Sequence, residues 1–516
     1  MITTLPTPRR ALPSRRVRGP LAAAVAVLLG LGALPAQAAL TGTLYPGLGY
    51  EIGIDPDGNP VPIGFVGPTL SYVLPGSTFG GVAAGRGVGI GSAQQSAGDS
   101  FLGYRGLVQT AQGAYALGTL GANSVAGGWT PVGAASSTAT AVADSGLVAG
   151  ASDLWSADGT QNFGGRPVWY APGDTVPHPL AMPQGFTDSS GMGYSGTSSI
   201  APNGVIVGWG QKYKGDASDG TRAIRWMTPD SPGVELQGLP GQSPWGGPNS
   251  SAVAINAKGV AVGSGNTFDS AGNLRGTSAL RWEADTTRPT PLGHLGTAAD
   301  GTFRSGALGV NDRGTAVGTS AKFDDAHNPL GDAAVRWPAK LAKPVDLGNL
   351  GVGRDGQSWT YALGIADSGT IYGVGEAYAA DGRDLGWRAI RWLPGEDKPH
   401  ALTPLTMSIA GTTYEYAFAM NRKGWIGGMA NAVLTDSGDF RDPSHLAVHA
   451  VVWAPDGHVH DLNKLLPPNS GWQLYGVFGI SDSNLVTGIG WYTPPGHDVS
   501  WAYQRLFSMQ LTKTAD

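Results

Sequence analysis

Aromatic residues recur in the loops of this 516-residue chain, beside glycine, serine, threonine and asparagine. A flat apolar ring flanked by neutral hydrogen-bonding groups is the chemistry with which a protein surface binds carbohydrate or peptide. Five such residues form the candidate ligand-binding set: Trp245, Phe303, Trp359, Tyr414 and Trp472. Packing inside the fold is the alternative for each ring, because residues at repeated positions usually serve the scaffold.

Carboxylates in the same loops are the candidates for catalysis. Asp300, Asp355 and Glu415, together with Arg354, would suit the acid–base cleavage of a polysaccharide if the fold brought the carboxyl groups within roughly 5–10 Å of one another. Solvated loop charges are the simpler interpretation. The sequence has no nucleophile elbow, zinc-protease motif or phosphate-binding loop. It therefore favours a non-enzymatic binding protein, with a polysaccharide hydrolase or lyase as the alternative.

Metal ions and nucleic acids have less support as ligands. Asp55 and Asp57 lie in an Asp-Pro-Asp-Gly-Asn stretch whose oxygens suit calcium, but such stretches also form ordinary turns and no twelve-residue calcium loop follows. No other metal or cofactor is predicted. A formal charge of −5 lacks the basic footprint that nucleic-acid binding requires. The expected partner is an extracellular glycan or protein.

The first 38 residues have the pattern of a secretory signal. An arginine-rich segment (residues 9–18) precedes an apolar run (residues 21–34), and Ala36-Gln37-Ala38 supplies a cleavage site. The apolar run is shorter than the roughly 20 residues that a membrane-spanning helix needs, and no second run follows it. We therefore expect a secreted or periplasmic monomer without a membrane span after cleavage. Because the chain has no cysteine, hydrophobic burial must stabilise it.

Tandem repeats must position the loops. Glycines 55 residues apart mark the repeat: Gly204, Gly259, Gly314, Gly369 and Gly424. Each follows an apolar segment and two or three turn residues, which predicts a hairpin whose glycine has a positive φ. The pattern extends backwards to Gly146 and Gly87 and forwards to Asn484, which gives eight copies.

Each copy predicts four short strands. The first is small and apolar, the second alternates, the third ends in Arg-Trp and the fourth carries Leu-Gly-x-Leu-Gly. This pattern predicts an all-β fold, a β-propeller of eight four-stranded blades. The third-strand tryptophans should be buried between blades: Trp226, Trp282, Trp337 and Trp392. We expect the arginines before them to pair with acids such as Glu235 or Asp346, or to cover a tryptophan face.

The chain ends predict how the ring closes. The last copy has three strands, the third near residues 502–509, and an isolated apolar stretch at residues 70–74 precedes the first copy. We predict that residues 70–74 complete the last blade and so remove an open sheet edge. The expected division is a signal peptide (1–38), an N-terminal extension with the closing strand (39–76), a repeat domain (77–511) and a tail (512–516).

Three recurring motifs also suggest a family. Ala-Ile/Val-Asn-x-x-Gly-x-Ala/Ile-Val-Gly, Ala-x-Arg-Trp and Asp-Leu-Gly-x-Leu-Gly resemble the bacterial HAF extracellular repeat proteins. The resemblance covers nearly all of the chain after residue 38, is strongest from Ser251 to Gly373, and fades at both ends. It implies an exported, propeller-like repeat protein. The family has no generally assigned activity, so the resemblance supplies no catalytic residue.

Overall fold

The computed structural model describes residues 40–46, 52–54, 60–62, 70–72, 83–84, 88–97, 100–110, 113–125, 132–241, 247, 249–432, 448–497 and 502–513. The sheets belong to one compact unit of the chain, Thr41–Thr512. Among the described residues, no helix has the length and apolarity needed to cross a membrane. The predicted signal peptide lies outside the described residues.

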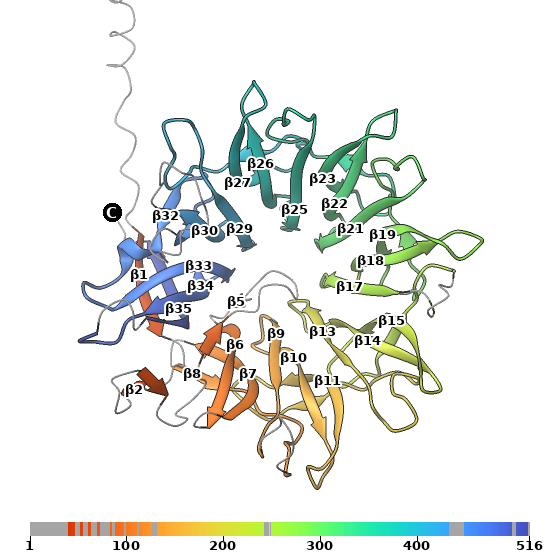
Figure 1. Ribbon diagram of the computed structural model, residues 1–516, viewed down its shortest axis with the longest axis vertical. Coiled ribbons are helices and arrows are strands. Elements are labelled where there is room, and N and C mark those ends of the chain that lie inside the picture. The colour runs from red at the N-terminus through yellow and green to blue at the C-terminus, as the bar shows by residue number, and fades with distance from the viewer. Residues whose placement is uncertain are drawn as a thin grey trace, which may run out of the picture. The chain divides into compact units, whose positions relative to one another are not determined.

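Most of the chain forms repeating units of four antiparallel strands, each named here by its first strand. The strands are β9 (Ser137–Val142), β10 (Val148–Trp155), β11 (Asn162–Tyr170) and β12 (His178–Pro179); β13 (Ser195–Ile200), β14 (Ile206–Lys214), β15 (Ala217–Trp226) and β16 (Val234–Leu236); β17 (Ser250–Ile255), β18 (Ala261–Phe268), β19 (Leu274–Trp282) and β20 (Thr290–Pro291); β21 (Phe303–Val310), β22 (Ala316–Phe323), β23 (Pro329–Trp337) and β24 (Val345–Asp346); β25 (Ser358–Ile365), β26 (Ile371–Tyr378), β27 (Asp384–Trp392) and β28 (His400–Ala401); and β29 (Glu415–Met420), β30 (Ile426–Asn431), β31 (Val448–Trp453) and β32 (Val459–Asp461). The first strand of each unit lies nearest a common axis, with later strands farther out (Figure 1). This radial arrangement defines a β-propeller.

The two ends of the chain form less regular sheets. The N-terminal sheet contains β4 (Leu70–Tyr72), β5 (Ala83–Ala84), β6 (Val88–Ala97), β7 (Ser100–Thr110) and β8 (Gly113–Ala116). The last sheet contains β1 (Leu40–Pro46), β33 (Trp472–Ile480), β34 (Leu485–Tyr492) and β35 (Tyr503–Lys513). A hairpin of β2 (Ile52–Ile54) and β3 (Pro60–Pro62) and a 3-10 turn, η2 (Leu462–Leu465), complete the elements. Because the N-terminal sheet has five strands, the count of eight four-stranded blades stays a prediction.

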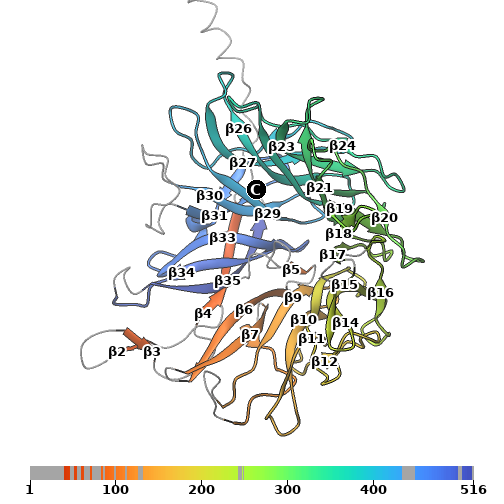
Figure 2. The ribbon, with the colours of Figure 1, turned by 45° about the vertical axis from the view of Figure 1, so that its right-hand side comes forward.

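The predicted closing strand is wrong. β1, not the stretch at residues 70–74, pairs with β35, whereas β4 pairs with β6. The short β5 pairs only with Val88 and Gly89, so the edge of β6 from Ser92 to Gln94 is left for β4. The last sheet lies beside the N-terminal sheet in Figures 1 and 2, and Leu107 packs in one cluster with Phe478. An N-terminal strand therefore does complete the last sheet, but an earlier one than predicted.

The repeated glycines have the predicted backbone. Their φ angles lie between 83° and 98°, and Asn484, the one non-glycine at this position, has a φ of 62°. In the turn of the β17 unit, Asn256 Oδ1 accepts the N–H groups of Lys258 (3.0 Å) and Val260 (2.9 Å). The hairpin is thus built from a side chain that caps it and a residue that tolerates positive φ.

The third-strand tryptophans are buried between units, as predicted. Trp226, Trp282, Trp337 and Trp392 are fully buried. The indole N–H of Trp282 donates to the carbonyl of Gln237 (3.0 Å), which follows the last strand of the preceding unit. Trp337 does the same with Gly293 (3.0 Å). Each indole therefore fills the space between two units and also satisfies a carbonyl of the neighbour.

The arginines before these tryptophans bind carbonyls, not acids. Arg281 Nη2 donates to the carbonyls of Trp337 and Pro338 in the next unit, both at 3.1 Å. The acids proposed as partners bind other cations: Glu235 binds Lys212 and Arg222, and Asp346 binds Lys322. The guanidinium has five donors in a planar fork, so it can join several carbonyls of one turn and fasten adjacent units.

The Leu-Gly-x-Leu-Gly motif follows the fourth strand rather than forming it. In the β17 unit the fourth strand is β20, and the motif begins after it at Leu292. Leu295 then bridges to Lys322 of the next unit. The motif ends at Gly296, whose φ is 134° and whose added Cβ would lie 3.2 Å from the Cβ of Phe323. The motif therefore carries the chain to the next unit and makes room for its aromatic residue.

Candidate functional site

The predicted aromatic residues lie where the first strand of a unit begins. Phe303, Trp359 and Trp472 are in the first two residues of β21, β25 and β33, and Tyr414 immediately precedes β29. All four are half-buried. Trp245 lies outside the described residues. For comparison, Tyr194, which precedes β13 at the position equivalent to Trp359, is 54% exposed.

Two of these rings line one groove. Phe303 and Trp359 face a cavity of about 370 Å³ between the β21 and β25 units, which Arg304, Phe323 and Asp332 also line. The remaining lining residues are Thr302, Ala321, Lys322, Pro329, Gly331 and Gln357. Tyr414 and Trp472 do not line it. Of the five rings predicted to form a ligand platform, two therefore line this groove.

A glycine brings Trp359 to the groove. β23 and β25 run parallel for one short stretch in which Gly331 pairs with Ser358 and Asp332 with Trp359. Gly331 has a φ of 93°, and an added Cβ would lie 2.0 Å from the carbonyl oxygen of Ser358. Only glycine permits this approach of the two backbones. The repeat therefore fixes Trp359 beside Asp332.

The polar part of the groove is a fixed ion pair. Arg304 Nη2 lies 2.7 Å from Asp332 Oδ1 and 2.8 Å from Oδ2, and Tyr361 Oη donates to Oδ2 at 3.2 Å. Burial, with the Asp332 charge next, raises the pKa of Tyr361 to about 12, so its hydroxyl stays a donor at neutral pH. The Arg304 side chain is 66% exposed. Its Nε and Nη1 are not used in the Asp332 contacts and can donate to a ligand.

The next junction has a tryptophan at the position of Asp332. Trp387 lies 55 residues after Asp332 and therefore at the same position in the β25 unit. Its ring stacks between Tyr361, at a centroid distance of 5.9 Å, and Tyr416, at 6.1 Å. The junction with the groove therefore has a small carboxylate where the next junction has an indole.

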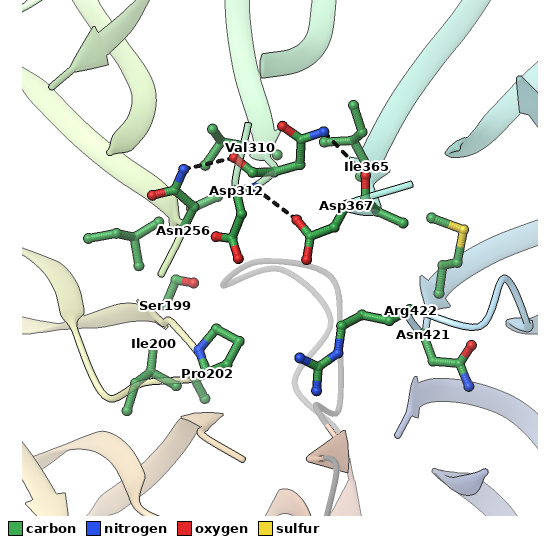
Figure 3. Close-up of a pocket in the computed structure, with 18 of the residues that line it drawn as sticks. Ser199, Ile200, Pro202, Asn256, Val310, Asp312, Ile365, Asp367, Asn421 and Arg422 are labelled. Carbon is green, nitrogen blue, oxygen red and sulfur yellow. Dashed lines mark hydrogen bonds between the residues drawn. The ribbon is translucent and has the colours of Figure 1, made fainter. Parts of the chain in front are cut away.

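A larger cavity, of about 580 Å³, lies at the common axis of the units. Aliphatic residues at the ends of the first strands line it, including Ile200, Val310 and Ile365 (Figure 3). The turns that follow those strands add a polar rim, in which Asp312, Asp367 and Arg422 are drawn in Figure 3.

The polar groups of this rim bind one another. The backbone N–H of Asp312 donates to Asp367 Oδ1 at 2.8 Å, and the N–H of Ala257 donates in the same way to Asp312. Arg422 forms ion pairs with Asp482 and, at 2.6 Å, with Asp144. The aspartates of the rim therefore join adjacent units, and Arg422 joins the β29 turn to the β9 turn, so we place the candidate ligand site in the groove instead.

The candidate catalytic acids do not form a pair. Asp300 Oδ1 accepts the backbone N–H of Thr302 at 2.9 Å, and Asp355 Oδ1 that of Gln357 at 3.0 Å, so both exposed carboxylates cap their own turns. Arg354 is also exposed. Glu415, in contrast, is fully buried. In the described part of the chain, the groove, the cavity at the axis and a further cavity beside Tyr378 are each lined by at most one of these three carboxylates.

Glu415 occupies a structural position. Thr360 precedes it by one repeat, at the position where Ser305 and Ser250 bridge to the preceding unit in earlier copies. Glu415 Oε1 accepts the N–H of Leu405 at 3.2 Å. Burial raises the pKa of Glu415 to about 7 against the opposing effect of Arg388.

The described residues form no group of three or more His, Cys, Asp or Glu side chains suited to a metal ion. Asp55 and Asp57, the weak calcium candidates, lie outside the described part of the chain.

Sequence reasoning missed the polar half of the groove. Arg304 and Asp332 belong to no motif, and their roles depend on a contact between units. One signal was present: Asp332 and Trp387 differ strongly in size at equivalent positions of adjacent repeats. Such a break in a repeat indicates a local departure from the scaffold.

Comparison with known proteins supplies no family for this chain. No family model matches the chain, and no curated protein matches it. Among solved structures, the β-propeller domain of the Trilobed protease from Pyrococcus furiosus is 8% identical with a TM-score of 0.42, over 78% of this chain and 98% of that one. The Dos1 propeller is 10% identical with a TM-score of 0.34, over 86% and 95%. The assignment of this chain as a β-propeller rests on its own strand topology.

Proposed function

We propose that this protein is an exported, non-enzymatic β-propeller that binds a segment of an extracellular glycan in the groove between its β21 and β25 units. The observation that carries the proposal is the convergence of Phe303 and Trp359 on one cavity that the ion pair of Arg304 and Asp332 also lines. Phe303 is itself held in place, since its ring stacks on His294 at a centroid distance of 4.2 Å. A rigid ring is a better platform than a mobile one, because less entropy is lost on binding.

The chemistry of the groove suits a sugar. The faces of pyranose rings are apolar and stack on aromatic rings, while their hydroxyl groups need donors and acceptors at the edges. Arg304 supplies donors, Gln357 supplies both kinds of group, and Asp332 fixes the guanidinium. The other cation of the groove, Lys322, is paired with Asp346 at 2.7 Å. Both charges are therefore balanced, which favours a neutral glycan over a strongly anionic one.

A glycan array probed with the purified mature chain tests the proposal. We expect retention on neutral glycans, and Trp359→Ala should weaken it about tenfold through the loss of one stacking face. Tyr194→Ala is the matched control, because Tyr194 has the equivalent position in a unit without this groove. Equal loss in the two variants, or retention only on peptide arrays, would contradict the glycan assignment.

Export is part of the proposal and is supported by the signal pattern of residues 1–38. N-terminal sequencing of the protein recovered from the periplasm or the medium should begin at Ala39. A protein that remains in the cytoplasm with residues 1–38 attached would refute this part and leave the groove unaffected.

A further inference from the structure

A second concavity lies next to the groove. It has a volume of about 510 Å³ and is lined by Tyr378, Arg354, Arg383, Asp355 and others. The other lining residues are Gly353, Gly382 and Asp384. Its four charged side chains are exposed, so a ligand reaches them from solvent.

One tight turn separates the two concavities. The backbone N–H of Gly353 donates to the carbonyl of Gln357 at 2.8 Å, and that of Gly356 donates to the carbonyl of Gly353 at 2.9 Å. Gln357 lines the groove, whereas Asp355 lines the second concavity. Two residues of chain span at most about 7 Å, so the concavities adjoin across this turn.

Equivalent positions of adjacent repeats contribute an aromatic ring to each concavity. Tyr378 ends β26 as Phe323 ends β22, one repeat earlier. An added Cβ on Gly351 would lie 3.2 Å from the Cβ of Tyr378, which reproduces the relation of Gly296 to Phe323. Tyr378 Oη donates to Glu376 at 2.6 Å, which fixes the ring. Each concavity therefore holds an oriented aromatic ring.

Arginines again provide the donors. Arg383 Nη1 donates to the carbonyl of Ala410 at 3.2 Å, and Arg354 Nε donates to that of Asp381 at 3.4 Å. The stem of Arg354 lies against Gly382, where an added Cβ would come within 2.9 Å of its Cγ. Both guanidinium groups are thus held by the backbone and keep further donors for a ligand.

We infer that the groove and the second concavity are two subsites of one site, which takes a linear neutral oligosaccharide that crosses the Gly353–Gln357 turn. This inference rests on the proposed glycan function. Phe303 and Trp359 contact one part of the sugar chain, and Tyr378 with Arg354 and Arg383 contacts the next part. The affinity of the site then rises with the length of the oligosaccharide, because each further subsite adds a ring contact and hydrogen bonds.

A length series tests the inference. An array of linear neutral oligosaccharides of one to six units, in several linkages, should show retention that rises about tenfold once the chain covers both subsites. Tyr378→Ala and Arg383→Ala should reduce binding of the long members to that of the short ones and leave the short ones unchanged. Phe268→Ala, at the position equivalent to Tyr378 two repeats earlier, is the control and should change neither.

The outcomes separate the two ideas. Retention that does not depend on length, or long-chain binding that survives Arg383→Ala, overturns the second subsite and leaves the groove intact. Absence of retention on every oligosaccharide overturns the proposed function itself. If Tyr378→Ala does not fold, Arg383→Ala alone tests the second subsite, because replacing this exposed residue removes no packed side chain.

Discussion

At the junction of the β21 and β25 units, Asp332 lines a groove of about 370 Å³. At the junction of the β25 and β29 units, the equivalent residue is Trp387, and its ring takes part in a stack instead. The stack continues from Tyr416 to Phe418, at a centroid distance of 6.3 Å, and from Phe418 to Phe478, at 4.8 Å. One junction therefore has an open groove with a polar side, and the next has a row of stacked aromatic rings.

The comparison separates what the repeat conserves from what it varies. Both junctions keep a fully buried third-strand tryptophan, Trp392 between the β21 and β25 units and Trp453 between the β25 and β29 units, and a turn glycine of positive φ. They differ at the positions where the strands meet solvent. In a repeat protein the constant positions give stability and the variable ones give function, and the two junctions show this division side by side.

The largest effect should come from a residue that both junctions share. Trp392→Ala removes a fully buried indole and its hydrogen bond to the carbonyl of Leu347, so we expect a loss of about 3–5 kcal/mol in the free energy of unfolding. Denaturant titration measures it. Trp387→Ala should cost clearly less, because that ring is only half-buried. Equal costs would show that the aromatic stack holds adjacent units together as strongly as the third-strand tryptophan does.

The next effect concerns a charge at the junction with the stacked rings. Glu415 is fully buried with a pKa of about 7, whereas an unfolded glutamate has a pKa near 4.3. The folded protein therefore binds this proton more tightly. Glu415 costs little stability below about pH 4, and its cost grows as the pH rises through 7, to a limit of about 4 kcal/mol.

Glu415→Gln should remove this dependence. The difference in unfolding free energy between Glu415→Gln and the unmodified protein should shift in favour of the variant from pH 4 to pH 8. Glu376→Gln is the control, since Glu376 is only half-buried and its raised pKa should produce a smaller shift. Parallel stability curves for Glu415→Gln and the unmodified protein would mean that Arg388 fully compensates the buried carboxylate.

A substitution can give the junction with the groove the tryptophan of the next junction. Asp332→Trp places in the β21 unit the residue that the β25 unit has at the same position, so the indole should occupy the groove. We expect glycan binding to fall at least about tenfold as the stacking faces are covered. Asp332→Asn keeps the size of the side chain and should retain most of the binding. Full binding by Asp332→Trp would place the ligand elsewhere.

The sequence predicts the constant part of the fold well. A 55-residue period, a glycine that must have positive φ and a tryptophan at the end of the third strand are local signals, and each describes one unit. They are sufficient for the propeller and for the burial of Trp282 and Trp337. The partners of the arginines were not predictable in the same way, because a carbonyl of the next unit has no sequence signature.

The chain ends and the groove depend on contacts between distant segments. The stretch at residues 70–74 has the sequence of a strand, and its first part, Leu70–Tyr72, forms β4. Whether this strand pairs with β35 or with β6 depends on how much of β6 the short β5 leaves free. The groove likewise lies between two units and is lined by residues of both. The repeat period and the strand propensities carry no information about such pairings. The positions of the aromatic rings could therefore be predicted, but the cavity that Phe303 and Trp359 share could not.

The smallest effect should come from the ion pair of the junction with the groove. Arg304 is 66% exposed, and the groove beside Asp332 admits water that can take the place of the guanidinium. We therefore expect Arg304→Gln to lower the unfolding free energy by less than about 1 kcal/mol, and the difference to shrink in 1 M salt, where charges are screened within about 3 Å. Glycan binding should fall several-fold in the same variant, because the fixed donors are lost. A stability loss well above 2 kcal/mol that persists in salt would mean that Asp332 behaves as a buried charge in need of its partner, since its side chain is only 11% exposed. The pair would then belong to the scaffold, and the distinction between the two junctions would rest on Phe303 and Trp359 alone.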